Sequence, residues 1–420
     1  MLTRFPAWPL IVDYVDKDRE LTAEDKEGIQ LALQHPDRVR RIGLWVPNSH
    51  LRNLVVAIDG EFPVLEHLLI GLQTKHDMRM GGLTLRDTFQ APHLRHLVFI
   101  HFPFLVAFPS LTTSVGLVTL SLNFVPRLFP YHVLRQLSSI PCLETLEITL
   151  LFHISVHDFE IEMQQWPISV FRRVTLPNLR RFVFKGSTAY LETLLPWMAT
   201  PLLERLQITF FSQLTFSVPR LLQYMSTANN LNFSSAEFSF SNGGVAVSGY
   251  PREGVSVPVF HMHILCGRFD WQVSSVAQIF DTLSPVLSAV VVLTLDNREH
   301  TSSPQHRSKT GATHWRDLLR SFNNVRTLRV HGGLVGSLSH VLRWSGQSPL
   351  ELLPELKELV CPTGGHAGDA LTAFINARKV VGHPVRLVHV DSPDSLPAGT
   401  GKSRRSYRSI LSAMAMRRRT

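Results

Sequence analysis

One nine-residue phrase returns along the whole chain. It reads IPCLETLEI at 140–148, APHLRHLVF at 91–99, TPLLERLQI at 200–208 and LPELKELVC at 353–361. The shared core is a leucine with apolar residues three and five positions later, as in Leu143, Leu146 and Ile148. Twelve intervals separate the first such triplet, at Val39, from the last, at Val385, and they average about 29 residues. A recurrence of this length is typical of a solenoid, in which similar units stack on one another.

Each repeat combines two hydrophobic periods. Leu146 and Ile148 alternate with Thr145 and Glu147, which predicts a strand with one buried face. The segments upstream have helical spacing, as in YHVLRQLSSI, AYLETLLPWM, VPRLLQYMST and THWRDLLRSF. Residues six positions before the anchor are expected to face the strands from the helices: Leu137, Trp197, Met225 and Leu319. Proline stands two positions before the anchor at 63, 92, 141, 177, 201 and 354, where it ends the helix.

These patterns predict an α/β fold built as a solenoid, with a parallel sheet on the concave side and helices on the convex side. A single unit cannot bury both of its apolar faces, whereas stacked units share one continuous core. The strands that follow six anchors should therefore be neighbours in one parallel sheet: Leu65, Leu94, Leu117, Leu143, Leu179 and Leu203.

The phrases LETLEI, LRHLVF, LERLQI, LEHLLI, VRTLRV and LKELVC resemble the Leu-x-x-Leu-x-Leu core of leucine-rich repeats. FQAPHLRHL, VTLPNLRRFVF and SPLELLPELKEL further resemble the leucine-rich regions of basidiomycete F-box proteins. The resemblance covers roughly residues 35–390. It implies an irregular horseshoe that recognises other proteins, in this family as substrates of an SCF-type, cullin-based ubiquitin ligase.

The chain departs from that family in two respects. The position three residues after the last apolar strand residue usually holds Asn or Cys. Here other residues occupy it, so we expect apolar packing to hold these turns: Gln73, Phe102, Val125, Leu151, Ser187, Phe211, Gly333 and Gly364. Residues 1–34 are too short and too acidic, in DKDRELTAEDKEG, to be an F-box. We interpret them as a lead-in and expect that this chain alone does not bind the ligase adaptor.

Charge separates the body of the chain from its C-terminal end. The formal net charge is +9, and residues 402–420 supply seven basic side chains and no acid. We therefore expect 391–420 to be a basic, disordered tail, which leaves weak contact with nucleic acid as an alternative function. Three dispersed cysteines and no run of about 20 apolar residues favour a soluble protein of the cytoplasm or nucleus, without a membrane partner.

No recognised catalytic, nucleotide-binding or zinc-protease motif occurs in the sequence. His93, His96 and His101 lie close together, as do His261 and His263, but no acid or cysteine at fitting spacing accompanies them. We interpret them as surface histidines and expect no catalytic residue, cofactor or metal. An enzyme of unrecognised type, with residues assembled from distant segments, stays an alternative.

Two segments interrupt the repeat. Residues 234–258 alternate like strands around Asn242-Gly243-Gly244, which indicates a hairpin or loop inserted at the surface. Residues 296–313 are polar and without periodicity, which indicates a mobile loop. Either segment could alternatively be a binding loop.

The outward positions of the strands give the candidate binding residues. In a parallel solenoid these side chains line the concave side, and their mixture of Arg, Thr and Glu fits a polar protein surface. The candidates are His96, Thr119, Thr145, Glu147, Arg181, Arg205, Gln207, Thr327 and Arg329. The leading hypothesis is a non-catalytic scaffold whose unknown protein partner binds there; cullin-ligase subunits would be partners only through an F-box.

Overall fold

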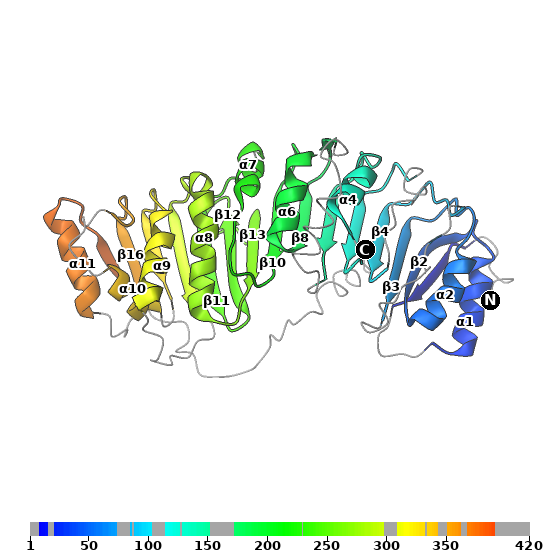
Figure 1. Ribbon diagram of the computed structural model, residues 1–420, viewed down its shortest axis with the longest axis horizontal. Coiled ribbons are helices and arrows are strands. Elements are labelled where there is room, and N and C mark those ends of the chain that lie inside the picture. The colour runs from blue at the N-terminus through cyan, green and yellow to red at the C-terminus, as the bar shows by residue number, and fades with distance from the viewer. Residues whose placement is uncertain are drawn as a thin grey trace.

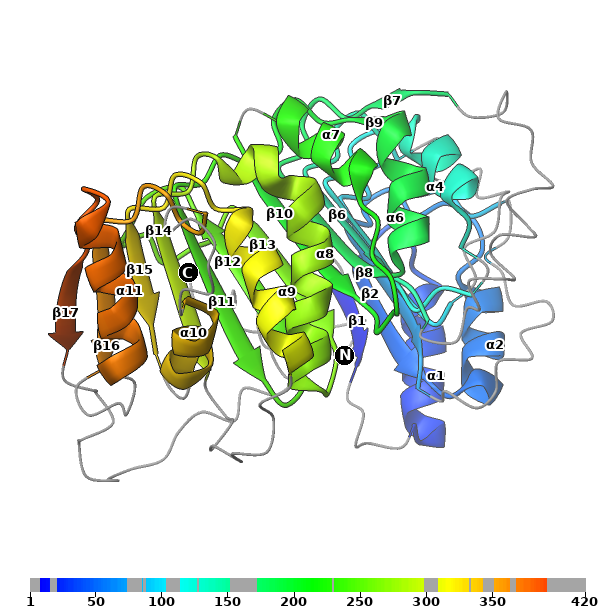
Figure 2. The same cartoon turned by 60° about the vertical axis from the view of Figure 1, so that its left-hand side comes forward.

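The computed structural model shows one large, mostly parallel sheet with helices along one face (Figures 1 and 2). It describes residues 8–15, 21–73, 85, 88–102, 114–126, 128–151, 172–228, 230–297, 309–331, 334–342, 351–362 and 368–390. The expected α/β class is confirmed, and so is the expected parallel sheet for most of its strands. The tail at 391–420 lies outside the described residues.

Within the described ranges, fifteen strands form this sheet. In spatial order they are β1 (Leu10–Tyr14), β2 (Val39–Val46), β3 (His67–Leu72), β4 (His96–Ile100), β5 (Thr119–Asn123), β6 (Thr145–Thr149), β8 (Arg181–Gly186), β10 (Arg205–Phe210), β13 (Phe260–Leu265), β12 (Gly244–Tyr250), β11 (Ser235–Ser241), β14 (Val292–Asn297), β15 (Thr327–Val330), β16 (Glu358–Pro362) and β17 (Arg386–Val390). The six strands that follow Leu65, Leu94, Leu117, Leu143, Leu179 and Leu203 are parallel neighbours, as predicted.

The helices lie between successive strands on one face of this sheet (Figure 2). They are α1 (Ala23–Leu33), α2 (Asn48–Ala57), α4 (Pro130–Leu137), α6 (Thr188–Leu194) with the short 3₁₀ turn η2 (Leu195–Trp197), α7 (Pro219–Thr227), α8 (Phe269–Leu287), α9 (Lys309–Arg320), α10 (Leu334–Leu342) and α11 (Gly368–Val380). The four segments with helical spacing all contain helices. A second, two-stranded sheet joins β7 (Val174–Thr175) to β9 (Met198–Ala199).

The repeated triplet forms the core between the sheet and the helices. Leu143, Leu146 and Ile148 are fully buried, as are their counterparts in the neighbouring strands. Burying one such side chain stabilises the fold by roughly 1.5–3 kcal/mol. Leu137, Met225 and Leu319 are buried as expected, whereas Trp197 in η2 is only partly buried.

A recurring tight turn explains why proline precedes the anchor leucine. The anchor amide donates to the carbonyl three residues earlier, as from Leu94 to Ala91 (3.1 Å) and from Leu203 to Thr200 (3.2 Å). Proline then occupies the second position of the turn, where its fixed φ is favourable and no amide hydrogen is needed. The turn directs the chain from the helix layer into the next strand.

Apolar packing holds three of the turns that lack the Asn, as expected. Phe102 and Val125 are completely buried and Phe211 almost so. Two others use polar bonds: the Gln73 side-chain amide donates to the carbonyl oxygen of Trp45 at 2.8 Å, and the Ser187 side chain accepts from the amide of Tyr190. The Gln73 bond joins neighbouring strands. Leu151 is partly buried, and Gly333 and Gly364 lie outside the described residues.

Two expectations need correction. The hairpin at 234–258 exists, with β11 and β12 on either side of Asn242-Gly243, but it is not a surface insertion. Both strands lie inside the sheet between β13 and β14, and Phe238 and Val247 are buried there. Only the following loop, residues 251–258, is largely exposed.

The last triplet, assigned to Val385, Val388 and Val390, is displaced by one residue. Strand β17 pairs Leu387 with Leu359, so Leu387 faces the core and Val390 is exposed. A slip of one residue moves every side chain of a strand to the other face.

At the other interruption, residues 298–308 of the expected loop lie outside the described part. Its two ends belong to β14 and α9. At the N-terminal end, the lead-in 1–34 contributes β1 and α1, and β1 pairs in parallel with β2. The sheet therefore begins before residue 35.

Candidate binding face

The side chains that point away from the helices form what we call the open face of the sheet. Register fixes which of them are neighbours, because paired residues on adjacent strands project from the same side. One row crosses five parallel strands and joins His96, Thr119, Thr145, Arg181 and Arg205. The structure thus places five of the nine candidate binding residues side by side.

A second row lies two residues further along the strands. It contains Glu147 and Gln207, with Val183 of β8 between them. The Glu147 carboxylate accepts from the Ser121 hydroxyl at 3.0 Å and lies 3.8 Å from the Arg181 guanidinium. Glu147 is therefore fixed by two neighbours.

Thr327 and Arg329 lie apart from the other candidates. They are on β15, separated from β10 by β13, β12, β11 and β14. Arg329 forms an ion pair with Glu253 in the exposed loop 251–258. The nine candidates therefore occupy two regions of the open face, and in the second region the arginine already has a partner within the chain.

The clustered histidines prove to be structural neighbours of other rings. His96 stacks on His67 of β3, with ring centroids 4.4 Å apart and planes 9° from parallel. Burial, helped by the nearby His96, lowers the pKa of His67 to about 4. His101 stacks on Phe124 at 4.9 Å. Within the ranges that the structure describes, no three His, Cys, Asp or Glu residues converge as metal ligands.

The hairpin brings a polar cluster to the open face that the repeat pattern did not reveal. The Ser248 hydroxyl lies 3.1 Å from Nδ1 of His261, and the Tyr250 hydroxyl donates to Glu237 at 3.3 Å. Burial is the main cause that lowers the pKa of His261. Strand β12 separates Glu237 from His261, so the three groups are not ordered as a Ser–His–carboxylate relay. The alternation of 234–250 was the available signal, but it does not identify the strands' neighbours.

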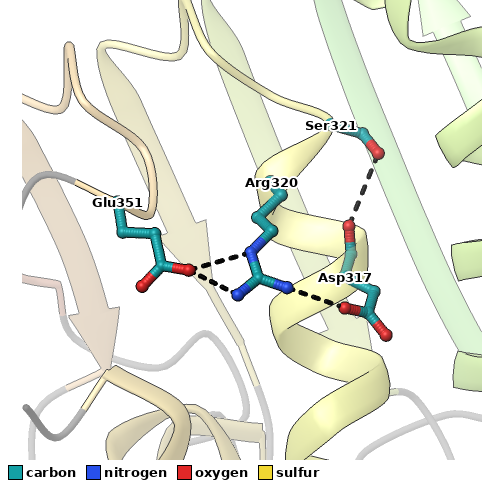
Figure 3. A network of polar contacts seen from close by, with 4 residues as sticks. All are labelled: Asp317, Arg320, Ser321 and Glu351. Carbon is teal, nitrogen blue, oxygen red and sulfur yellow. Dashed lines mark hydrogen bonds and ion pairs between the residues drawn. The ribbon is translucent and has the colours of Figure 1, made fainter. Parts of the chain in front are cut away.

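Polar contacts on the helix side have a structural role. Figure 3 shows Arg320 of α9 between Asp317 of the same helix and Glu351, which precedes β16. Arg320 Nε donates to Glu351 at 3.1 Å, and Nη1 donates to Asp317 at 3.0 Å. The buried Arg378 of α11 donates to the carbonyl oxygens of Leu353 (3.1 Å) and Pro354 (2.8 Å). These arginines join helices to the turns before the strands.

Comparison of the sequence with known protein families gives no match, and comparison with curated proteins gives none either. In the helices that the structure describes, none is long and apolar enough to cross a membrane.

Proposed function

We propose that this chain is a non-catalytic scaffold for protein–protein interaction, and that a protein partner binds along the open face. The row from His96 to Arg205 carries the proposal. It presents uncharged hydrogen-bonding groups and arginines over five neighbouring strands, on the side of the sheet opposite to the helices (Figure 2). Arginine is common among the residues that dominate binding energy at protein interfaces.

The finer architecture is part of the same proposal. The recurring turn before the strand, the parallel register and the buried triplets support a leucine-rich-repeat solenoid with its partner on the concave side. The resemblance of the repeats to those of fungal F-box proteins supports a role in selecting substrates for a ubiquitin ligase. The chain alone is expected not to bind the ligase adaptor, and a micromolar or tighter complex between the two purified proteins would contradict that expectation.

Obstruction of the open face tests the proposal. Thr145→Trp with Gln207→Trp places bulk on strands β6 and β10, whereas Gln223→Trp with Asn376→Trp places the same bulk on α7 and α11. Proteins captured from a native extract should be lost with the first variant and kept with the second, at similar melting temperatures. Both variants add two tryptophans, so non-specific stickiness is matched.

Deletions distinguish this proposal from its rivals. If capture survives the open-face substitutions and is lost on removing 296–313 or 402–420, the partner binds there and the open-face proposal is wrong. Strong salt dependence that disappears with the tail would favour nucleic acid as the ligand.

A further inference from the structure

Where β8 and β10 begin, two consecutive pairs of residues face each other with different charges. Just before the two strands, Arg180 forms an ion pair with Glu204. One residue later, Arg181 is paired in register with Arg205, so two guanidinium groups project from adjacent strands on the open face. Neighbouring strands are about 4.8 Å apart, and like charges placed directly opposite each other are destabilising.

This arginine pair has little compensation from acidic side chains. In the described strands β3, β4, β5, β6, β8, β10 and β13, which are consecutive in the sheet, Glu147 is the one carboxylate at an open-face position, and it already accepts a hydrogen bond from Ser121. It lies 3.8 Å from Arg181. Arg205 is exposed and takes part in none of the ion pairs between described residues. Lys185, further along β8, adds a third positive charge to the same face.

The surroundings of the pair limit the kind of ligand. Thr145, Thr149, Gln207 and Thr209 on the open-face positions of β6 and β10 offer uncharged hydrogen-bonding groups. A carboxylate lies on each side of Arg181 and Arg205 along the sheet. Glu147 is on the adjacent strand β6, and Glu237 is on β11, beyond β13 and β12. A polyanion that crossed the sheet would meet both of them, whereas one or two carboxylates would not.

We propose that Arg181 and Arg205, with Lys185 beside them, anchor an acidic, extended segment of the partner protein. Arginine binds carboxylates through charge-assisted, often bidentate hydrogen bonds, and two adjacent guanidinium groups can bind consecutive acidic side chains. The backbone of the segment would meet the threonine and glutamine side chains. The inference rests on the open face being the binding surface and specifies the chemistry of its partner.

A defined peptide tests this chemistry. The probe is a fluorescent Gly/Ser peptide with a central Asp-Glu-Asp-Glu, measured by anisotropy against its Asn-Gln-Asn-Gln counterpart. The full chain is used with Arg404, Arg405, Arg417, Arg418 and Arg419 changed to Ser, so that the tail adds little background. Arg181→Glu with Arg205→Glu should weaken binding of the acidic peptide at least about tenfold, a change of about 1.4 kcal/mol.

A charge-matched control keeps the test specific. Arg135→Glu with Lys379→Glu changes the net charge equally, but both residues are exposed on helices. This control should alter affinity less than about threefold, and Arg181→Lys with Arg205→Lys should retain part of the binding. Unchanged melting temperatures would show that the variants fold.

Three results would overturn the inference. The first is that Arg181→Glu with Arg205→Glu and its helix control lose the same affinity for the acidic peptide. The second is that the Asn-Gln-Asn-Gln peptide binds as tightly as the acidic one, and the third is that only a phosphorylated peptide or an oligonucleotide binds. If Thr145→Trp with Gln207→Trp loses the captured partner, its helix-side control keeps it and the acidic peptide does not bind, the open face remains the binding surface and the partner is not acidic.

Discussion

The run from β3 to β10 and the segment β13–β12–β11 solve the same packing problem with different chain paths. In the first, each strand pairs with the next in parallel. In the second, the chain passes from β10 to β11, leaves room for two strands, and returns through antiparallel β12 to β13. The positions of the strands are kept while their order along the chain is reversed.

The core row is continuous through both regions. Ile208, Met262, Val247, Phe238 and Leu295 are register neighbours from β10 to β14, and all are essentially buried. Alternation of side chains is the same in parallel and antiparallel strands, so reversing one strand leaves the buried face intact. The comparison teaches that this sheet requires a side-chain register more than a chain direction.

The largest expected effect tests whether the hairpin is as central as the parallel run. Phe238→Ala removes a ring that lies 5.1 Å from that of Phe280 and 5.8 Å from that of Phe322. The matched change, Phe182→Ala, empties a fully buried site on β8. Both should lower the free energy of unfolding by about 3–5 kcal/mol in chemical denaturation. A cost below about 1 kcal/mol for Phe238→Ala alone would show that the hairpin is peripheral.

A smaller effect is expected at the hairpin turn. Gly244 has φ +151°, and a Cβ there would lie 2.1 Å from the carbonyl oxygen of Ile264 on β13. Gly244→Ala should therefore cost about 2–3 kcal/mol, because the pairing of β12 with β13 must shift. Gly243→Ala is the control, since a Cβ at Gly243 meets nothing within 4 Å. Equal unfolding free energies for the two variants would contradict the close approach of these strands.

The sequence predicted most of this architecture where local pattern and neighbour order agree. Triplets at Leu65 to Leu203 identified the strands, and Asn242-Gly243 identified the hairpin. The central position of the hairpin could not be predicted, because alternation indicates a strand with one buried face and does not say which strand lies beside it. At β17 the valines Val388 and Val390 lie on the open face and Leu387 faces the core, so periodicity that followed the valines chose the wrong register.

The candidate site was predictable to the same degree. His96, Thr119, Thr145, Arg181 and Arg205 follow from register once the strands are consecutive. The engagement of Arg329 did not follow, because Glu253 is 76 residues away in the chain and belongs to the loop after the hairpin. Whether these residues bind a partner stays a prediction.

Acidification should destabilise the parallel run through His132 on α4. The side chain is 8 % exposed, and burial lowers the pKa of its imidazole to about 4. Protonation therefore favours the unfolded chain, and stability present above pH about 6.5 is lost as pH falls towards 4. For this group the loss between pH 7.5 and 5 is about 2 kcal/mol.

Two variants separate the titration from the polarity of His132. The imidazole nitrogens have no hydrogen-bond partner among the described residues. His132→Leu and His132→Gln should both reduce the pH dependence of the unfolding free energy, while only His132→Leu should match or exceed the wild-type stability at pH 7.5. If both variants retained the full pH dependence, groups elsewhere in the chain would be responsible for it.

The smallest effect compares two exposed ion pairs, one in each region. Glu253→Gln breaks the contact of loop 251–258 with Arg329, and Glu204→Gln breaks the contact of Glu204 with Arg180. Each should change the unfolding free energy by less than about 1 kcal/mol, because exposed pairs gain little from Coulomb attraction in water.

The two regions should differ in local motion instead of in stability. Residues 252–257 are exposed, so loss of the Arg329 contact should speed hydrogen exchange and proteolysis within that loop. Glu204 lies directly before β10 and its amide donates to the carbonyl oxygen of Arg180 at 2.8 Å, so the backbone there stays fixed in Glu204→Gln. Unchanged exchange in both variants would mean that the Glu253–Arg329 pair does not hold the loop.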